Sequence, residues 1–214
     1  MKVVVVGANG QIGRLTVRQL QESDQHFVTA VVRKQEQLAE LQEKGINTAL
    51  LDLEGKVEDI IQAFTGADCV IFTAGSGGHT GPDKTLLIDL DGAVKCIEAA
   101  EAAGVERFLM VSAYDADKRE KWNADMRPYY VAKHYADQIL EQSSLNYTIV
   151  RPGGLVNEPP IGKITVGVNA EPSTISREDV ASVLVQSIEE PNTYQKSFNL
   201  VNGSLDIKQA LQEL

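Results

Sequence analysis

In KVVVVGANGQIG, residues 2–13, a short apolar run leads directly into a glycine-rich turn, and this arrangement is the strongest indication of the fold. Gly7 permits a tight turn, Gly10 lets the backbone approach a pyrophosphate, and Gly13 allows a helix to pack closely on the strand. Glycines at this spacing can also simply punctuate a turn, but their place between a first strand and a first helix favours dinucleotide binding. The turn residues that we expect at the cofactor are Gly7, Asn9, Gly10, Gln11, Ile12 and Gly13.

Short β-branched runs alternate with segments of helical periodicity along the first 150 residues. The expected strands are 2–6, 27–32, 47–51, 68–73, 106–111 and 147–150. The expected helices are 10–22, 36–44, 57–64, 83–103 and 124–143. Strands that are apolar throughout and separated by helices indicate a parallel sheet covered on both faces. We therefore predict an α/β fold with a doubly wound parallel sheet in the order 3-2-1-4-5-6.

The pattern changes after Pro152, where loops rich in glycine and proline precede a helix at 176–189, a strand at 197–201 and a last helix at 205–213. This tail is short for an independent domain. We expect a single domain, with a dinucleotide-binding core at 1–155 and a small C-terminal cap at 156–214 on the substrate side.

Composition limits the classes of partner. The chain has 214 residues, 43% hydrophobic content and a net charge of −10, which disfavours nucleic acid and anionic membrane surfaces and leaves a small-molecule substrate. Cys69 and Cys96 lack metal-ligand spacing, so we expect buried thiols and no metal site. The N-terminal apolar run is too short for a signal peptide, so we expect a cytoplasmic protein. The oligomeric state, monomer or dimer, stays open.

Arg33 and Lys34 follow the second expected strand, where an acidic residue would bind the ribose of NAD and an arginine suits the 2′-phosphate of NADP. A guanidinium can hold a phosphate through two hydrogen bonds, so the pair favours NADPH over NADH. The alternative is a solvated basic pair on a loop.

Two further strand ends contribute candidate cofactor contacts. Asp52 and Leu53 follow the third strand and are placed to border the adenine, although an ordinary polar turn would use the same residues. The segment TAGSGG, residues 73–78, supplies small side chains where a dinucleotide must pass close to the backbone. From it we expect Thr73, Ala74 and Gly75 at the cofactor.

The sequence resembles the short-chain dehydrogenase/reductase superfamily, and in particular its atypical single-domain NAD(P)-binding branch with a Rossmann fold. The segments that carry this resemblance are GANGQIG, VVRK, LDLEG, FTAGSGG, YYVAKHYAD and YTIVRPGGL. The resemblance covers Met1 to about Leu155. It implies a reactive group of Ser112, Tyr129 and Lys133, with Lys133 also at the nicotinamide ribose. It further implies that Pro152, Gly153 and Leu155 lie beside the nicotinamide.

The residue types fit proton donation. Hydride transfer to an acceptor builds negative charge, and a phenol whose pKa is lowered by a neighbouring ammonium can protonate it, while a serine hydroxyl can hold the acceptor oxygen. We therefore expect an NADPH-dependent oxidoreductase acting on a small carbonyl, quinone or flavin. A non-catalytic NADP(H)-binding redox sensor is the alternative, and a sugar-nucleotide epimerase is a weaker one. Ser112 could also only end a strand.

Two adjacent tyrosines, Tyr129 and Tyr130, precede Lys133, and helical spacing places both near the lysine. The expected apolar stripe separates them, since Tyr129 lies about 50° from its centre and Tyr130 about 150°. We predict Tyr129 as the proton donor, the alternative being that it only packs on the sheet. The stripe consists of Ala132, Tyr135, Ala136, Ile139 and Leu140. The charged segment 113–127 before it is expected to be either a lid or a surface excursion.

Overall fold

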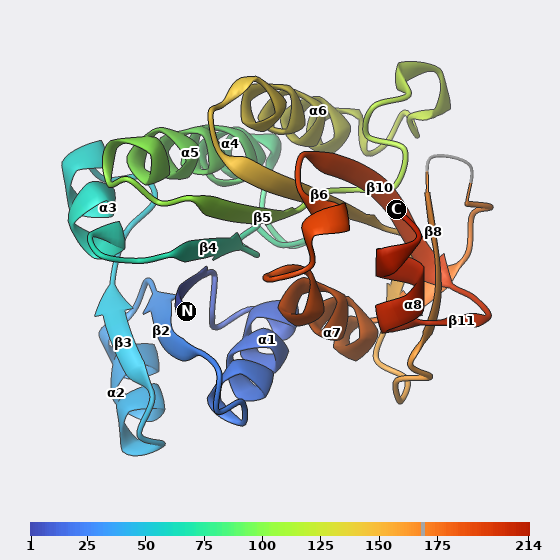
Figure 1. Ribbon diagram of the computed structural model, residues 1–214. Helices are drawn as coiled ribbons and strands as arrows, with labels where there is room; N and C mark the ends of the chain where they lie inside the picture. Colours follow the sequence, from blue (N-terminus) through green and yellow to red (C-terminus); the bar gives the residue numbers. More distant parts are fainter. Residues whose placement is uncertain (168–169) are drawn as a thin grey trace.

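The computed structural model describes residues 1–167 and 170–214, and the six strands expected in the first 150 residues all form in it (Figure 1). These strands are β1 (Lys2–Val6), β2 (Phe27–Val32), β3 (Asn47–Leu50), β4 (Cys69–Phe72), β5 (Arg107–Val111) and β6 (Asn146–Pro152). They pair in parallel in the order β3-β2-β1-β4-β5-β6, which confirms the predicted topology. The chain forms one α/β domain with a mostly parallel sheet.

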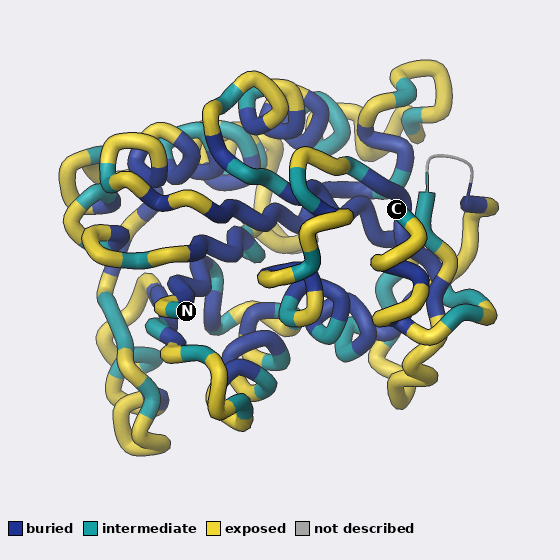
Figure 2. Tube along the Cα trace, viewed as in Figure 1, coloured by how far each residue is buried: buried dark blue, intermediate teal, exposed yellow. Residues whose placement is uncertain are grey.

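Helices cover both faces of this sheet. They are α1 (Gln11–Gln21), α2 (Gln35–Glu43), α3 (Val57–Phe64), α4 (Pro82–Lys84), α5 (Ala93–Ala102), α6 (Arg127–Gln142), α7 (Arg177–Ser187) and α8 (Ile207–Gln212). In Figure 1, α3, α5 and α6 lie on one face and α1, α2, α7 and α8 on the other. Figure 2 shows the strands between these layers as largely buried, because their side chains are apolar on both faces.

The C-terminal residues extend the sheet. Strand β10 (Lys196–Asn202) pairs in parallel with β6, and β8 (Lys163–Gly167) pairs antiparallel with β10, followed by β11 (Leu205–Asp206) at the edge. Two short strands, β7 (Gly154–Val156) and β9 (Thr174–Ser176), form a separate parallel pair. We did not predict β7, β8, β9 or β11, because runs of two to five residues among glycines and prolines carry little periodicity.

The long helix expected at 83–103 is interrupted. Residues Thr85–Gly92 form a π-helical segment, η1, between α4 and α5. Within it Asp89 is buried, and Gly92 lies close to Leu53, where a Cβ would meet the leucine side chain at 3.3 Å. A π-helical segment is rare and often lies at a functional site. Helical periodicity alone could not reveal it.

Helix α6 begins at Arg127, three residues later than expected, because the Asn123 side chain accepts the Asp125 N–H (2.9 Å) and holds a turn there. The expected apolar stripe is partly wrong. Ala132, Ala136 and Leu140 are buried, but Tyr135 is exposed and its hydroxyl accepts a hydrogen bond from Arg119 (3.1 Å). Among the described residues, no helix is both long enough and apolar enough to span a bilayer.

Candidate active site

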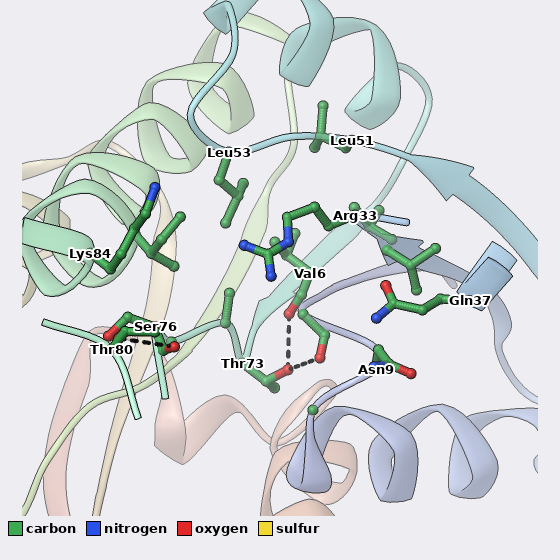
Figure 3. Close-up of a pocket in the computed structure, with 17 residues that line it drawn as sticks. Val6, Asn9, Arg33, Gln37, Leu51, Leu53, Thr73, Ser76, Thr80 and Lys84 are labelled. Carbon is green, nitrogen blue, oxygen red and sulfur yellow. Dashed lines mark hydrogen bonds between the residues drawn. The ribbon is translucent and has the colours of Figure 1, made fainter. Parts of the chain in front are cut away.

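A cavity of about 480 Å³ opens at the carboxyl ends of β1, β2 and β4, where the order of the strands reverses (Figure 3). Open α/β sheets bind their ligands at this position. Eight of the expected cofactor residues line it: Gly7, Asn9, Gly10, Arg33, Leu53, Thr73, Ala74 and Gly75. The sequence did not single out nine other lining residues: Val6, Val31, Val32, Gln37, Leu51, Ser76, Thr80, Lys84 and Ile88.

The backbone of the glycine turn packs so closely on neighbouring backbone that side chains would not fit at Gly7 and Gly13. Gly7 has φ +81°, and a Cβ on it would lie 2.6 Å from the Ala74 backbone. A Cβ on Gly13 would lie 2.3 Å from the Gly7 carbonyl oxygen, so α1 can approach the turn only with glycine there. Gly10 caps α1 without a side-chain hydrogen bond, and the first helical turn has no acidic residue. The helix N-terminus is therefore open to an anion. Gln11, Ile12 and Gly13 do not line the cavity themselves.

Arg33 and Lys34 occupy different surroundings. The Arg33 side chain points into the cavity between Leu53 and Val6 (Figure 3). Within the described part of the chain, its guanidinium has no hydrogen-bond or ion-pair partner. Lys34 lies outside the cavity at the start of α2, where its N–H donates to the Gln37 side chain (3.2 Å). The basic pair thus places one cation, not two, at the expected ribose position.

The ends of β3 and β4 shape the opposite wall. Leu53 lines the cavity, but Asp52 is exposed and its carboxylate accepts the Glu54 N–H (3.0 Å), so it forms the polar turn that was the alternative. The Thr73 hydroxyl donates to the Val6 carbonyl oxygen (2.9 Å) and joins β4 to β1. At the rim, Lys84 pairs with Glu54 at 2.7 Å.

Lys133 is buried and connected to the cavity wall. Its Nζ donates to the Val111 carbonyl oxygen at the end of β5 (2.9 Å) and lies 3.7 Å from Asp89 Oδ1. The other oxygen of Asp89 accepts the N–H of Ser76, a lining residue (2.9 Å). Asp89 therefore links the lysine to the loop after β4. This contact could not be predicted, because the sequence around Asp89 has the periodicity of an ordinary helix.

The rings of the two adjacent tyrosines have different neighbours, and Tyr129 as the proton donor stays a prediction. The Tyr130 ring stacks on Trp122 at 5.9 Å and 11°, within the segment before α6. The Tyr129 ring is half-buried, and its centroid lies 5.8 Å from Lys133 Nζ. Burial raises the pKa of Tyr129 more than Lys133 lowers it, and Asp89 raises it further. The expected net lowering of this pKa is wrong, because burial and the nearby carboxylates outweigh the single ammonium.

Ser112 faces the interior. Its Oγ is buried and, among the described residues, has no partner of good hydrogen-bond geometry. Burial raises the pKa of the neighbouring Asp137, although Arg151 and the Ser112 hydroxyl each lower it in part. Asp137 in turn accepts a hydrogen bond from Arg151 Nε (2.9 Å). Because Ser112 does not line the cavity, its contact with an acceptor oxygen stays a prediction.

The segment expected beside the nicotinamide lies next to the C-terminal strands. The Pro152 carbonyl oxygen accepts the Tyr114 N–H (3.2 Å), and a Cβ on Gly153 would lie 2.2 Å from the Ser173 carbonyl oxygen. Leu155 pairs with Ile175 in the small sheet. None of Pro152, Gly153 and Leu155 lines the cavity, so their cofactor contacts also stay predictions.

The charged segment before α6 is packed on the protein. Trp122 contacts both Tyr130 and His134 on α6. Asp115 has a left-handed backbone (φ 53°), and its carboxylate accepts from Asn199 of β10 (2.8 Å). These contacts tie the segment to α6 and to the C-terminal strands, next to the site.

Cys69 and Cys96 are both free and buried, as expected. Burial raises the pKa of the Cys69 thiol to about 12, which leaves it protonated and unreactive at neutral pH. Across residues 1–167 and 170–214, no group of three or more His, Cys, Asp and Glu side chains is arranged to hold a metal ion.

Residues 7–191 match the family model described as NAD(P)H-binding. The chain is 53% identical over 214 residues, the full length of both proteins, to the uncharacterized sugar epimerase YhfK of Bacillus subtilis (strain 168). Among solved structures, it is similar to a Bacillus halodurans protein described as a candidate NAD-dependent epimerase/dehydratase (TM-score 0.93, 42% identity, 100% of both chains). It is also similar to the oxidoreductase ylbE from Lactococcus lactis (TM-score 0.91, 32% identity, 100% of this chain and 96% of that one). The names of these proteins give three chemistries on one fold: epimerisation, dehydration and oxidoreduction.

Proposed function

Because the chain belongs to the NAD(P)H-binding family, with the Rossmann fold of the atypical short-chain dehydrogenases/reductases, we propose that it is an NADPH-dependent reductase of a small carbonyl, quinone or flavin acceptor. One observation carries the proposal. The Tyr129–Lys133 pair stands at the carboxyl edge of the sheet and is joined to the cavity wall by Asp89, through Lys133 Nζ on one side and the Ser76 N–H on the other.

The residues of the cavity fit a dinucleotide. Gly7 and Gly10 would admit the pyrophosphate against the backbone at the N-terminus of α1, and Arg33 would hold the adenosine ribose phosphate. The bound dinucleotide supplies the hydride. Tyr129 then donates its phenolic proton to the oxygen that becomes negative, while Lys133, fixed by the Val111 carbonyl oxygen, holds a positive charge near the phenol.

We expect NADPH to bind more tightly than NADH, and Arg33→Asp to reverse this preference. The substitution removes a charge-assisted contact of about 1.5–3 kcal/mol, so the affinity for NADPH should fall roughly 10- to 100-fold. Calorimetry with both cofactors measures the effect. Lys34→Asp is the matched control, because it makes the same change of charge outside the cavity and should leave the ratio nearly unchanged. Equal affinities for NADPH and NADH in the unaltered protein would contradict the assignment of Arg33.

The reductase activity is tested by following NADPH oxidation with a panel of quinones, flavins, aldehydes and ketones. Turnover with any of them supports the proposal. Tight NADPH binding without turnover on the whole panel would instead favour a non-catalytic redox sensor.

A sugar epimerase is the second candidate, favoured by the name of the Bacillus subtilis relative of equal length. An epimerase recycles its cofactor within each turnover and consumes no NADPH. A panel of nucleotide sugars, analysed for epimeric products with a catalytic amount of cofactor, separates this activity from net reduction.

A further inference from the structure

Two buried carboxylates flank the ammonium group of Lys133. Asp89 approaches it from η1 at 3.7 Å, with side chains of the two residues only 2% and 5% exposed. Asp137 follows Lys133 by one turn of α6, so both side chains lie on the same helix face. The single positive charge beside Tyr129 is therefore shared between two negative groups.

Arg151 does not make up for the second carboxylate, because it has acidic partners of its own. Its guanidinium contacts Asp137 (2.9 Å), Asp117 (3.4 Å) and Glu141 (3.4 Å). Two cations, Lys133 and Arg151, thus face four carboxylates. The excess of negative charge behind the phenol disfavours a second, phenolate charge.

We propose that this charge arrangement keeps Tyr129 a neutral phenol and so commits the site to reduction, with an electrophilic carbonyl or conjugated carbonyl compound as the substrate class rather than the hydroxyl of a sugar. The inference rests on the proposed function and narrows its substrates. Oxidation of an alcohol, the first step of many epimerisations, begins with removal of a hydroxyl proton and needs a phenolate. Reduction needs the opposite form, a phenol that still carries its proton.

The groups that face Tyr129 act in the same direction. On α6 these are Lys133, Asp137 and Tyr130, and on η1 Asp89. Burial raises the pKa of Tyr129, Lys133 lowers it, and the two carboxylates and Tyr130 raise it. Only one of the four neighbours favours the phenolate.

The proton balance of the reduction closes with this phenol. A hydride adds to the acceptor carbon, the electron pair of the C=O bond moves to oxygen, and that oxygen takes the proton of Tyr129. The phenolate then recovers a proton from solvent, so each turnover consumes one NADPH and one proton.

The ionisation of Tyr129 can be measured directly by NMR on protein with ¹³Cζ-labelled tyrosine. The chain has six tyrosines, and the signal of Tyr129 is identified by its loss in Tyr129→Phe. We expect Tyr129 to titrate above the ordinary tyrosine value of about 10. Asp89→Asn and Asp137→Asn should each lower the midpoint, and Lys133→Met should raise it. Asp117→Asn is the matched control, since it also contacts Arg151 but does not face Tyr129.

A midpoint below about 10 in the unaltered protein would overturn the inference, as would an unmoved midpoint in both Asp89→Asn and Asp137→Asn. The unaltered protein and Asp89→Asn keep the test valid if Asp137→Asn does not fold. Calorimetry with NADPH distinguishes the two proposals. Failure to bind NADPH defeats the proposed function whatever the titration shows, whereas binding together with a low Tyr129 midpoint defeats only the commitment to reduction.

Discussion

Tyr129→Phe is expected to lower the turnover of an accepted substrate by about 10²-fold or more, while Tyr130→Phe leaves it nearly unchanged. The first substitution removes the only proton that Tyr129 can donate and keeps the ring that packs beside Lys133. The second removes a hydroxyl from a ring whose observed role is to stack on Trp122. Turnover of both variants should be compared at equal NADPH occupancy.

The pair of variants serves as its own control, because each loses one phenolic oxygen from adjacent positions of α6. Full activity in Tyr129→Phe with loss in Tyr130→Phe would show that the assignment of the donor is wrong. If both variants keep full activity, the proton comes from another group or from water. A change in NADPH affinity alone would point to a packing role for Tyr129.

Much of the fold could be predicted because, in the first 155 residues, the local sequence pattern and the long-range packing favour the same strands and turns. The four valines of KVVVV are buried in β1, and Gly7 follows them at φ +81°, where only glycine fits against Ala74. Such features act over a few residues and can be recognised in a sequence. The C-terminal strands β8 and β11 are stabilised mainly by pairing with distant residues, so their own sequences say little.

The candidate site also contains residues that could be predicted from the sequence and residues that could not. Residues on the turns, such as Gly7, Gly10 and Arg33, follow from their place after a strand, and the structure sets them around the cavity. Asp89 could not be predicted, because its contact with Lys133 depends on a π-helical segment packing against α6. The pKa of Tyr129 was misjudged because the spacing of Tyr129 and Lys133 shows the cation but neither the burial of the phenol, which raises its pKa most, nor Asp89.

Arg107→Met is expected to lower the free energy of unfolding by about 3 kcal/mol or more, and the melting temperature by roughly 6–12 °C. Arg107 is buried at the start of β5, and burial lowers its pKa to about 10, so it is still cationic at neutral pH. No carboxylate contacts it within the described residues. Its five hydrogen bonds go to neutral oxygens of Asn146, Thr148, Ser187, Ile188 and Thr193.

These five bonds join β5 to β6, to the end of α7 and to the segment before β10, so the loss should appear as global destabilisation in thermal or denaturant unfolding. Arg107→Lys keeps the positive charge, but an ammonium group cannot reach all five acceptors. We therefore expect it to lower the free energy of unfolding less than Arg107→Met does.

Arg18→Met is the matched surface control. Arg18 forms an ion pair with Glu178 at 2.6 Å, the same distance as the hydrogen bond from Arg107 to the Asn146 carbonyl oxygen. The Arg18 side chain, however, is 50% exposed. Solvent already hydrates both partners, so the expected loss is at most about 1 kcal/mol. An equal loss in Arg18→Met and Arg107→Met would contradict the view that buried, uncharged acceptors, rather than close opposite charges, hold the C-terminal strands to the core.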